Sequence, residues 1–353
     1  MSHGTAKTKE EDEIPPPQRP PSPPPHLSFA ARGIHPPTFS AFKPRDIRIT
    51  SSKGMEHIAW NCDGRRLGAV GIDKLVRVWT PEKSMDFRAA TIFSGGHTEE
   101  VDYISWNPTH PDLFCSSSQK DKRIVFWDAR QSRYVQQVSL KYTTPSTTVY
   151  SPDGKTLLYT TPVRHVWVLK HNKKDDGKEA WESVKSDTLI ASNAQFSHNG
   201  DYIVLNNSAE HTLRVVDFPA MKVVHSTPAH VNGCVATALD PRGRYLASAG
   251  HDSIVNMFDL SEWICARTIT AADHAITGLS FSHDGEFLAL STQGPYIDIC
   301  ATETGEPLHR VPTLGASPTV QWHPSKYVMA YCGPLTPSGT AWISLFGPGM
   351  SIY

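Results

Sequence analysis

The sequence has no long apolar run. None of its hydrophobic stretches approaches the roughly 20 residues that a helix needs to cross a bilayer. Its N-terminus is polar and then rich in proline, whereas a secretory signal has an apolar core. These absences predict a soluble intracellular protein that makes no contact with a membrane.

Disulfide-type cysteine spacing and an excess of charge are also missing. The six cysteines are scattered and form no CxxC pair, which is typical of a reducing compartment. Lys and Arg together number 34 against 35 Asp and Glu, so the net charge is only -1. Because such a balance gives no general attraction to phosphate backbones, we expect no direct binding to duplex DNA.

Motifs of known chemistry are absent as well. The sequence contains no Walker-type phosphate loop, no GxSxG nucleophile turn and no HExxH zinc motif, and its 17 histidines are not spaced like zinc ligands. We therefore expect no catalytic, cofactor-binding or metal-binding residues, and a protein that is not an enzyme.

What the chain does contain is a repeat. An apolar residue, any residue and then a large apolar residue precede a turn of Asn, Asp, Pro or Gly, and each turn is followed by two more short β-rich runs. The anchors lie 41 to 46 residues apart, at Trp60, Trp106, Tyr150, Phe196, Leu239, Phe281 and Trp322. Seven units of this length predict an all-β fold, a seven-bladed WD-repeat β-propeller.

The domain boundaries follow from composition. Residues 15–25 hold eight prolines, so residues 1–43 are predicted to be a disordered proline-rich tail, with the propeller spanning 44–348. Two interpretations of the prolines stay open, a stiff disordered tail or a docking peptide for an aromatic groove. The last repeat lacks an outer strand, and residues 46–50 are predicted to supply it and close the ring.

The most regular repeat, residues 95–128, contains a set that resembles a catalytic triad: His97, one serine of Ser116, Ser117 and Ser118, Asp121 and Trp127. Of the three serines we select Ser117. A single active site would not recur at the repeat spacing. Here His230 and Asp252 take the places of His97 and Asp121. We therefore predict a structural network of buried hydrogen bonds in each of the two repeats.

Three turn residues directly precede aspartates at equivalent positions of the repeats. They are Ile72, Lys120 and His251. Loops on a rigid β scaffold often carry binding residues. We expect these three to lie on one face of the ring and to contact a partner protein.

Several stretches resemble one family more closely than the general repeat does. They are WNCDGRRLGAVGIDK from Trp60, WNPTHPDLFCSSSQKDKRIVFWD from Trp106, LSFSHDGEFLALSTQGPYIDICATETGEPL from Leu279, VQWHPSKYVMAYCG from Val320, and the late ISLFG. Over roughly residues 44 to 347 the chain resembles the THO complex subunit 3 family. The turn NPTHPDLF and the strand IDICATETG, which lacks a Trp-Asp ending, are the most specific features.

The resemblance implies a non-enzymatic scaffold subunit in the nucleus. It would bind the large helical subunits of the THO (TREX) complex, and through them a DEAD-box RNA helicase and mRNA indirectly. Its role would be to couple transcription to mRNP assembly and mRNA export. The family supplies no catalytic residues to transfer.

Two other functions remain open from the residues alone. Basic residues near the repeat tryptophans, such as Lys120 and Arg123 near Trp127, are compatible with a propeller that binds single-stranded RNA directly. The same fold is also compatible with a WD-repeat adaptor or substrate receptor of another complex.

Overall fold

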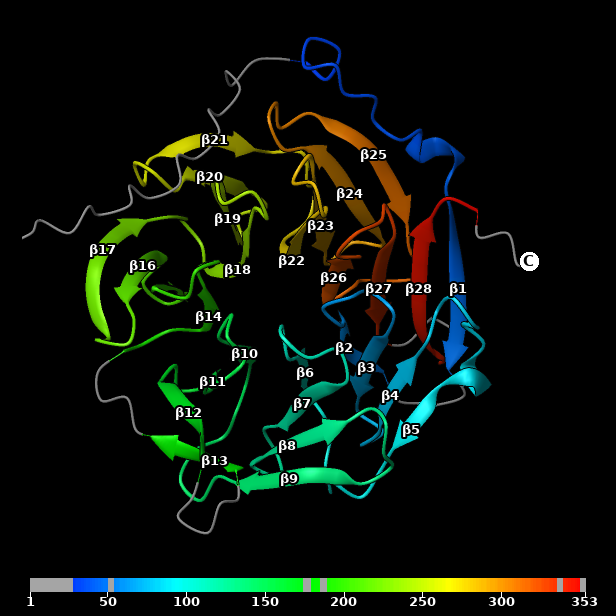
Figure 1. The fold of residues 1–353 in the computed structure, drawn as a ribbon. Coiled ribbons are helices and arrows are strands. Elements are labelled where there is room, and N and C mark those ends of the chain that lie inside the picture. Colours follow the sequence, from blue (N-terminus) through cyan, green and yellow to red (C-terminus); the bar gives the residue numbers. More distant parts are fainter. Residues whose placement is uncertain (1–27, 50–53, 174–178, 185–188, 335–338, 350–353) are drawn as a thin grey trace, which may run out of the picture.

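The computed structural model describes residues 28–49, 54–173, 179–184, 189–334 and 339–349. Seven four-stranded antiparallel sheets are arranged in a ring as the blades of a propeller (Figure 1). The predicted all-β, seven-bladed fold is thus confirmed. The only helical elements in the described ranges are the 3-10 turns η1 (Phe39–Ala41) and η2 (Phe87–Ala89), and neither is long enough to cross a membrane.

Each blade places its strands in chain order from the centre of the ring outward, except blade 7. Blades 1 to 3 consist of β2 (Met55–Trp60), β3 (Leu67–Gly71), β4 (Val76–Trp79) and β5 (Thr91–Phe93); β6 (Tyr103–Trp106), β7 (Leu113–Ser118), β8 (Arg123–Asp128) and β9 (Tyr134–Ser139); and β10 (Thr148–Tyr150), β11 (Thr156–Thr160), β12 (Val166–Lys173) and β13 (Glu179–Val184).

Blades 4 to 7 repeat the pattern. They consist of β14 (Asn193–Phe196), β15 (Tyr202–Asn207), β16 (Thr212–Asp217) and β17 (Lys222–Pro228); β18 (Cys234–Leu239), β19 (Tyr245–Gly250), β20 (Val255–Asp259) and β21 (Cys265–Ile269); β22 (Ile276–Phe281), β23 (Phe287–Thr292), β24 (Tyr296–Ala301) and β25 (Pro307–Pro312); and β26 (Thr319–Trp322), β27 (Met329–Gly333), β28 (Ala341–Gly347) and β1 (Lys43–Ile49).

All seven anchors named from the sequence are the last residues of the inner strands. We call the end of the ring where the inner strands begin, as at Tyr103 and Cys234, the entry face. The end where they finish, as at Trp106 and Leu239, is the exit face. This polarity fixes where every turn lies, because each following strand runs back in the opposite direction.

The hydrophobic core lies between neighbouring blades rather than inside one of them. One buried cluster joins Val76 and Phe93 of blade 1 to Phe114 and Trp127 of blade 2. The outer strand β17 is mostly exposed, whereas the second strand of blade 5, β19, is buried throughout. A blade can therefore bury its faces only against its neighbours, which makes closure of the ring a condition for stability.

Two tryptophan indoles reinforce the inner ring. Trp106 Nε1 donates to the Ala59 carbonyl of the preceding blade at 3.0 Å. Trp60 Nε1 donates to the Gln321 carbonyl at 3.3 Å, across the junction of blades 1 and 7. Hydrogen bonds between inner strands thus continue through the point where the two ends of the chain meet.

The predicted closing strand is present. β1 pairs antiparallel with β28 from Lys43 opposite Gly347 to Ile49 opposite Ala341. In Figure 1 the blue strand lies beside the red one at the edge of blade 7. Ile47 and Ile49 point into the blade, at 6% and 2% exposure, so the strand contributes apolar burial as well as its hydrogen bonds.

The predicted boundary of the tail was wrong for residues 28–43. Phe29 lies 5.5 Å from the Phe287 ring between centroids, and buried Phe39 lies 5.0 Å from the same ring. Arg32 Nη1 forms an ion pair with Glu286 at 2.6 Å. These residues pack on blade 6, where aromatic and ionic contacts outweigh the cost of ordering them. Residues 1–27 lie outside the described part of the chain.

The closing strand gives a test of ring closure. Replacing Ile49 by Ala removes buried methylene groups at the terminal junction, so the free energy of unfolding should fall by about 2–5 kcal/mol. Arg48→Ala, on the exposed side of the same strand, should change it by less than about 0.5 kcal/mol. Denaturant titration of both variants checks this. Equal unfolding midpoints for Ile49→Ala and Arg48→Ala would contradict the assignment of β1 as the closing strand.

One inner-strand histidine links stability to pH. His57 stacks on Tyr103 of the next blade, with ring centroids 3.8 Å apart. Burial lowers the pKa of His57 to about 3, although a backbone hydrogen bond at Ile104 opposes the shift. In the folded protein the ring therefore stays neutral at mildly acidic pH, where the unfolded chain takes up a proton.

Because the folded pKa lies below the unfolded value, the stability that His57 confers is lost as pH falls below the unfolded pKa. From about pH 7.5 to about pH 5, this one site should reduce the free energy of unfolding by about 2 kcal/mol. His57→Phe should remove that part of the pH dependence whatever its effect at neutral pH. Denaturant titrations at both pH values measure this change. The same loss of unfolding free energy between about pH 7.5 and about pH 5 in both proteins would exclude the lowered pKa of His57.

Candidate functional site

The set that resembles a triad is assembled on the entry face of blade 2. His97 Nδ1 lies 2.9 Å from Asp121 Oδ2, and His97 Nε2 lies 2.8 Å from Ser116 Oγ. Trp127 Nε1 donates to the same Ser116 oxygen at 2.8 Å. The serine in the network is therefore Ser116, and the choice of Ser117 from the sequence was wrong.

The correction has a simple geometric cause. Neighbouring residues of a strand point to opposite faces, so only one of two adjacent serines can meet His97. Ser116 and Ser117 lie next to each other in β7 and are both fully buried. The Ser117 hydroxyl has no hydrogen-bond partner among the described residues.

The contacts of the network fit a structural role. The Asp121 carboxylate only accepts, so His97 Nδ1 donates to it, and His97 Nε2 shares a hydrogen bond with the Ser116 hydroxyl. Burial is the largest single influence on Asp121 and would raise its pKa, but the hydrogen bonds from His97 and the Thr98 backbone, together with the nearby positive charges, lower the pKa overall. The Ser116 oxygen is 0% exposed and engaged with two partners, so no substrate can reach it.

Blade 5 repeats the arrangement with one partner changed. His230 Nδ1 lies 3.1 Å from Asp252 Oδ2, and His230 Nε2 lies 2.9 Å from Ser248 Oγ. Phe258, at the end of the third strand, stands where blade 2 has its tryptophan and donates no hydrogen bond. Burial lowers the pKa of His230, with Asp252 acting against it, so the imidazole is neutral at physiological pH.

The three predicted contact residues lie on the same face as these networks. Ile72, Lys120 and His251 occupy the turns that follow β3, β7 and β19, and those strands end at the entry face. Ile72 is half-buried, while Lys120 and His251 are exposed. Lys120 forms an ion pair with Glu100 at 2.6 Å, which fixes the position of its ammonium group.

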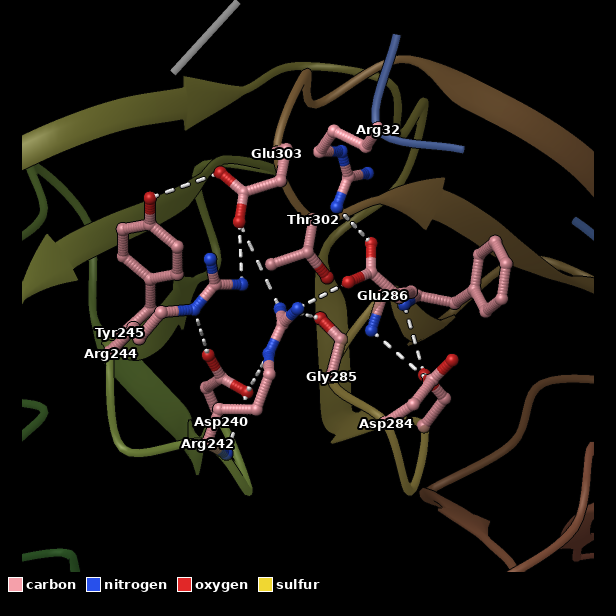
Figure 2. A network of polar contacts seen from close by, with 12 residues as sticks. Arg32, Asp240, Arg242, Arg244, Tyr245, Asp284, Gly285, Glu286, Thr302 and Glu303 are labelled. Atoms are coloured by element: carbon pink, nitrogen blue, oxygen red, sulfur yellow. Dashed lines mark hydrogen bonds and ion pairs between the residues drawn. The ribbon is translucent and has the colours of Figure 1, made fainter. Parts of the chain in front are cut away.

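On the exit face the structure reveals a network that was not predicted from the sequence. It crosses the junction of blades 5 and 6, as Figure 2 shows. Arg244 Nη2 lies 2.5 Å from Glu303 Oε1, and Arg242 bridges Asp240 to Glu286. Asp240 and Glu303 are both 0% exposed. Two arginines thus compensate two carboxylates that burial would otherwise penalise strongly.

Arg32 extends this network to the segment before the first strand. Its guanidinium contacts Oε2 of Glu286, whereas Arg242 contacts Oε1 of the same carboxylate (Figure 2). The Arg32 side chain is 7% exposed, so it is a buried member of the network. A signal was present in the sequence: Glu303 lies in the turn directly after β24, within the stretch CATETG, which is the same departure from the Trp-Asp ending that marked the family resemblance.

The described residues hold no group of three or more His, Cys, Asp or Glu side chains arranged to bind a metal ion. The basic residues near the repeat tryptophans are largely paired. Arg77 contacts Asp73 at 2.5 Å, and Lys74 contacts Glu99 at 3.4 Å. The arrangement on both faces is therefore one of fixed, mutually compensated side chains that can present a surface to a partner.

Comparison with known proteins places this geometry in a family. The model of the "WD domain, G-beta repeat" matches residues 90–128 and 221–259, which contain the residues of both histidine networks. THO complex subunit 3 of Arabidopsis thaliana is 32% identical over 288 residues, covering 80% of this chain and 87% of that protein. The chain belongs to the THO complex subunit 3 family.

Other similarities are more distant. The WD repeat-containing protein AAC3 of Dictyostelium discoideum is 26% identical, with 83% of this chain and 64% of that protein covered. Among solved structures, the β-propeller domain of Cps50 (Swd1) from Myceliophteria thermophila gives a TM-score of 0.71 at 17% identity, covering 85% of this chain and 99% of that one. The second likeness concerns the fold alone.

The blade 2 network can be tested through stability. Replacing His97 by Ala leaves the buried Asp121 and Ser116 groups without their partner, so the free energy of unfolding should fall by about 1–3 kcal/mol. His251→Ala, an exposed histidine on the same face, should change it by less than about 0.5 kcal/mol. Thermal or denaturant unfolding measures both, and an unaltered His97→Ala protein would exclude the network's structural role.

Proposed function

We propose that this protein is a non-catalytic interaction subunit of a THO complex in the nucleus. The observation that carries the proposal is the 32% identity to THO complex subunit 3, which extends over 87% of that relative. Through the complex, the protein would couple transcription to mRNP assembly and mRNA export. Its direct partners would be the large helical subunits, with a DEAD-box RNA helicase and mRNA engaged indirectly.

The mechanism is rigid presentation of a surface. A ring closed by β1 and tied by hydrogen bonds between the inner strands of neighbouring blades holds turns of different blades at fixed relative positions. A partner that docks on such a surface orders few side chains of the propeller, so little of the contact energy is lost to entropy. Ile72, Lys120 and His251 are the proposed contact residues, one each on blades 1, 2 and 5.

Direct binding of RNA by the isolated propeller is less well supported. Neutralising phosphates requires a cluster of free Lys or Arg side chains. Near the repeat tryptophans, Lys74, Arg77 and Lys120 each form an ion pair with a neighbouring carboxylate. The RNA connection therefore falls to other subunits in this proposal.

Affinity purification of the tagged full chain from nuclear extract tests the proposal. We expect the other THO subunits to co-purify in defined ratios, as identified by mass spectrometry. The combined change Ile72→Ser, Lys120→Ala and His251→Ala should reduce their recovery by about tenfold, corresponding to about 1.4 kcal/mol of binding free energy.

The matched control lies on the exit face. Lys326→Ala removes a side chain that is 52% exposed and paired with Glu82, and it should leave recovery unchanged. Normal recovery with the triple variant would move the interface away from the entry face. Failure of the unaltered chain to recover any THO subunit would refute the proposed membership.

A further inference from the structure

A cleft opens on the exit face between blades 4 and 5. It has a volume of about 870 Å³, and its base includes Val204 and Val215, both 2% exposed. Tyr202 and Trp263 line it together with His225, whose ring lies 5.8 Å from Trp263 at an angle of 30°. The cleft thus combines an apolar floor with aromatic walls, the composition of a ligand groove.

Exposed apolar side chains contribute to this cleft. Tyr202 and Val224 line it and are 42% and 53% exposed, and Val223 and Ile264, the chain neighbours of Val224 and Trp263, are 41% and 55% exposed. Val224 is the extra residue of a β-bulge, since Val215 pairs with His225 and Val216 pairs with Val223. Apolar groups gathered in this way on a soluble domain mark a surface that another chain segment covers.

A polar group in the cleft also lacks a partner. The His225 Nε2 atom is buried and makes no hydrogen bond with any described residue. Buried nitrogens are normally satisfied, so an orphan at the wall of an open cleft indicates a ligand that supplies the missing partner. A backbone carbonyl is a suitable partner, and proline residues keep that group free.

The chain's own N-terminal segment reaches this place. Arg32 is held by Glu286, Glu286 is held by Arg242, and Arg242 lines the cleft. The described chain begins at Ser28, four residues before that anchor. At roughly 3.1 Å per residue for polyproline II, the residues back to position 15 span up to about 40 Å, enough to cross the cleft.

The segment also has matching chemistry. Residues 15–25 read PPPQRPPSPPP, and polyproline helices dock in grooves lined by aromatic side chains. The prolines of the segment therefore find a complementary surface in the cleft.

We propose that the proline-rich segment, residues 15–25, docks into the cleft between blades 4 and 5 of its own propeller. Arg32 fixes one end of the segment beside the cleft. Docking is then intramolecular, with an effective concentration in the millimolar range that compensates for the modest affinity of a short proline-rich peptide. The proposal is independent of membership in any complex, and of the two interpretations of the tail it selects the docking peptide.

Site-specific photo-crosslinking of the full chain tests the proposal. A benzophenone amino acid replaces Tyr202, and mass spectrometry identifies the crosslinked peptide. We expect crosslinks to residues 15–25. The matched control places the same group at Tyr134, which is 43% exposed on the outer strand of blade 2 and should give no crosslink to that segment.

Mixing isotopically light and heavy chains distinguishes the occupants. Crosslinks within one isotope class support docking in the same molecule, whereas mixed crosslinks show a second copy and overturn it. Absence of any crosslink to residues 15–25 also overturns it.

Two variants test whether the prolines and the aromatic wall of the cleft are responsible for the crosslink. Changing all eight prolines of residues 15–25 to serine leaves the propeller unaltered, and should lower the crosslink yield by about tenfold, the effect of losing about 1.4 kcal/mol of docking energy. Trp263→Ala should also lower the crosslink yield, because it removes an aromatic side chain from the wall of the cleft. An undiminished yield in the serine variant would show that the crosslink reflects proximity alone and would refute recognition of the prolines.

Discussion

Closure of the ring by β1 and β28 is the constraint on which the rest of the structure depends. Seven residue pairs join a strand from near the start of the chain to one near its end. Every blade buries its faces against two neighbours, so an unclosed ring would leave two blades with an exposed face. The same closure brings Trp60 within hydrogen-bond distance of Gln321 and so completes the inner ring.

Polar networks on the two faces complement the apolar contacts between blades. On the entry face, His97 and His230 each join a turn aspartate to a serine of the second strand. On the exit face, Arg242 and Arg244 compensate buried carboxylates of blades 5 and 6. The exit-face network favours one alignment of blades 5 and 6, because a wrong alignment would leave its buried polar groups unpaired. Fixed geometry is what a binding surface requires.

Much of the fold could be predicted from the sequence because its repeat is local. Each anchor, such as Trp106 or Phe281, ends an inner strand. This end could be predicted because the turn-forming residues follow the anchor directly in the sequence. The pairing of His97 with Asp121 could also be predicted, because the motif recurs at the repeat spacing. The choice between Ser116 and Ser117 could not, as it depends on the pleat of a single strand.

Contacts between distant parts of the chain could not be predicted from the sequence. Arg32 and Glu286 are 254 positions apart, and neither belongs to a repeated motif. Residues 28–43 were therefore assigned to a disordered tail on composition, although Phe29 and Phe39 pack on Phe287. The ionic network was missed for the same reason: Asp240 and Glu303 have the charge expected of surface turns, and only the neighbouring blade buries them.

The shared seventh blade also has a consequence for biosynthesis. β1 leaves the ribosome before the strands of any complete blade, but its partner β28 ends at Gly347, so the early strand has no native neighbour until the whole propeller has been made. Blades 1 to 6 can form in order as they emerge, whereas the ring can close only after β28 has been made. During that interval β1 is an unpaired edge that chaperones must protect from wrong partners, and a prematurely terminated chain would keep it permanently.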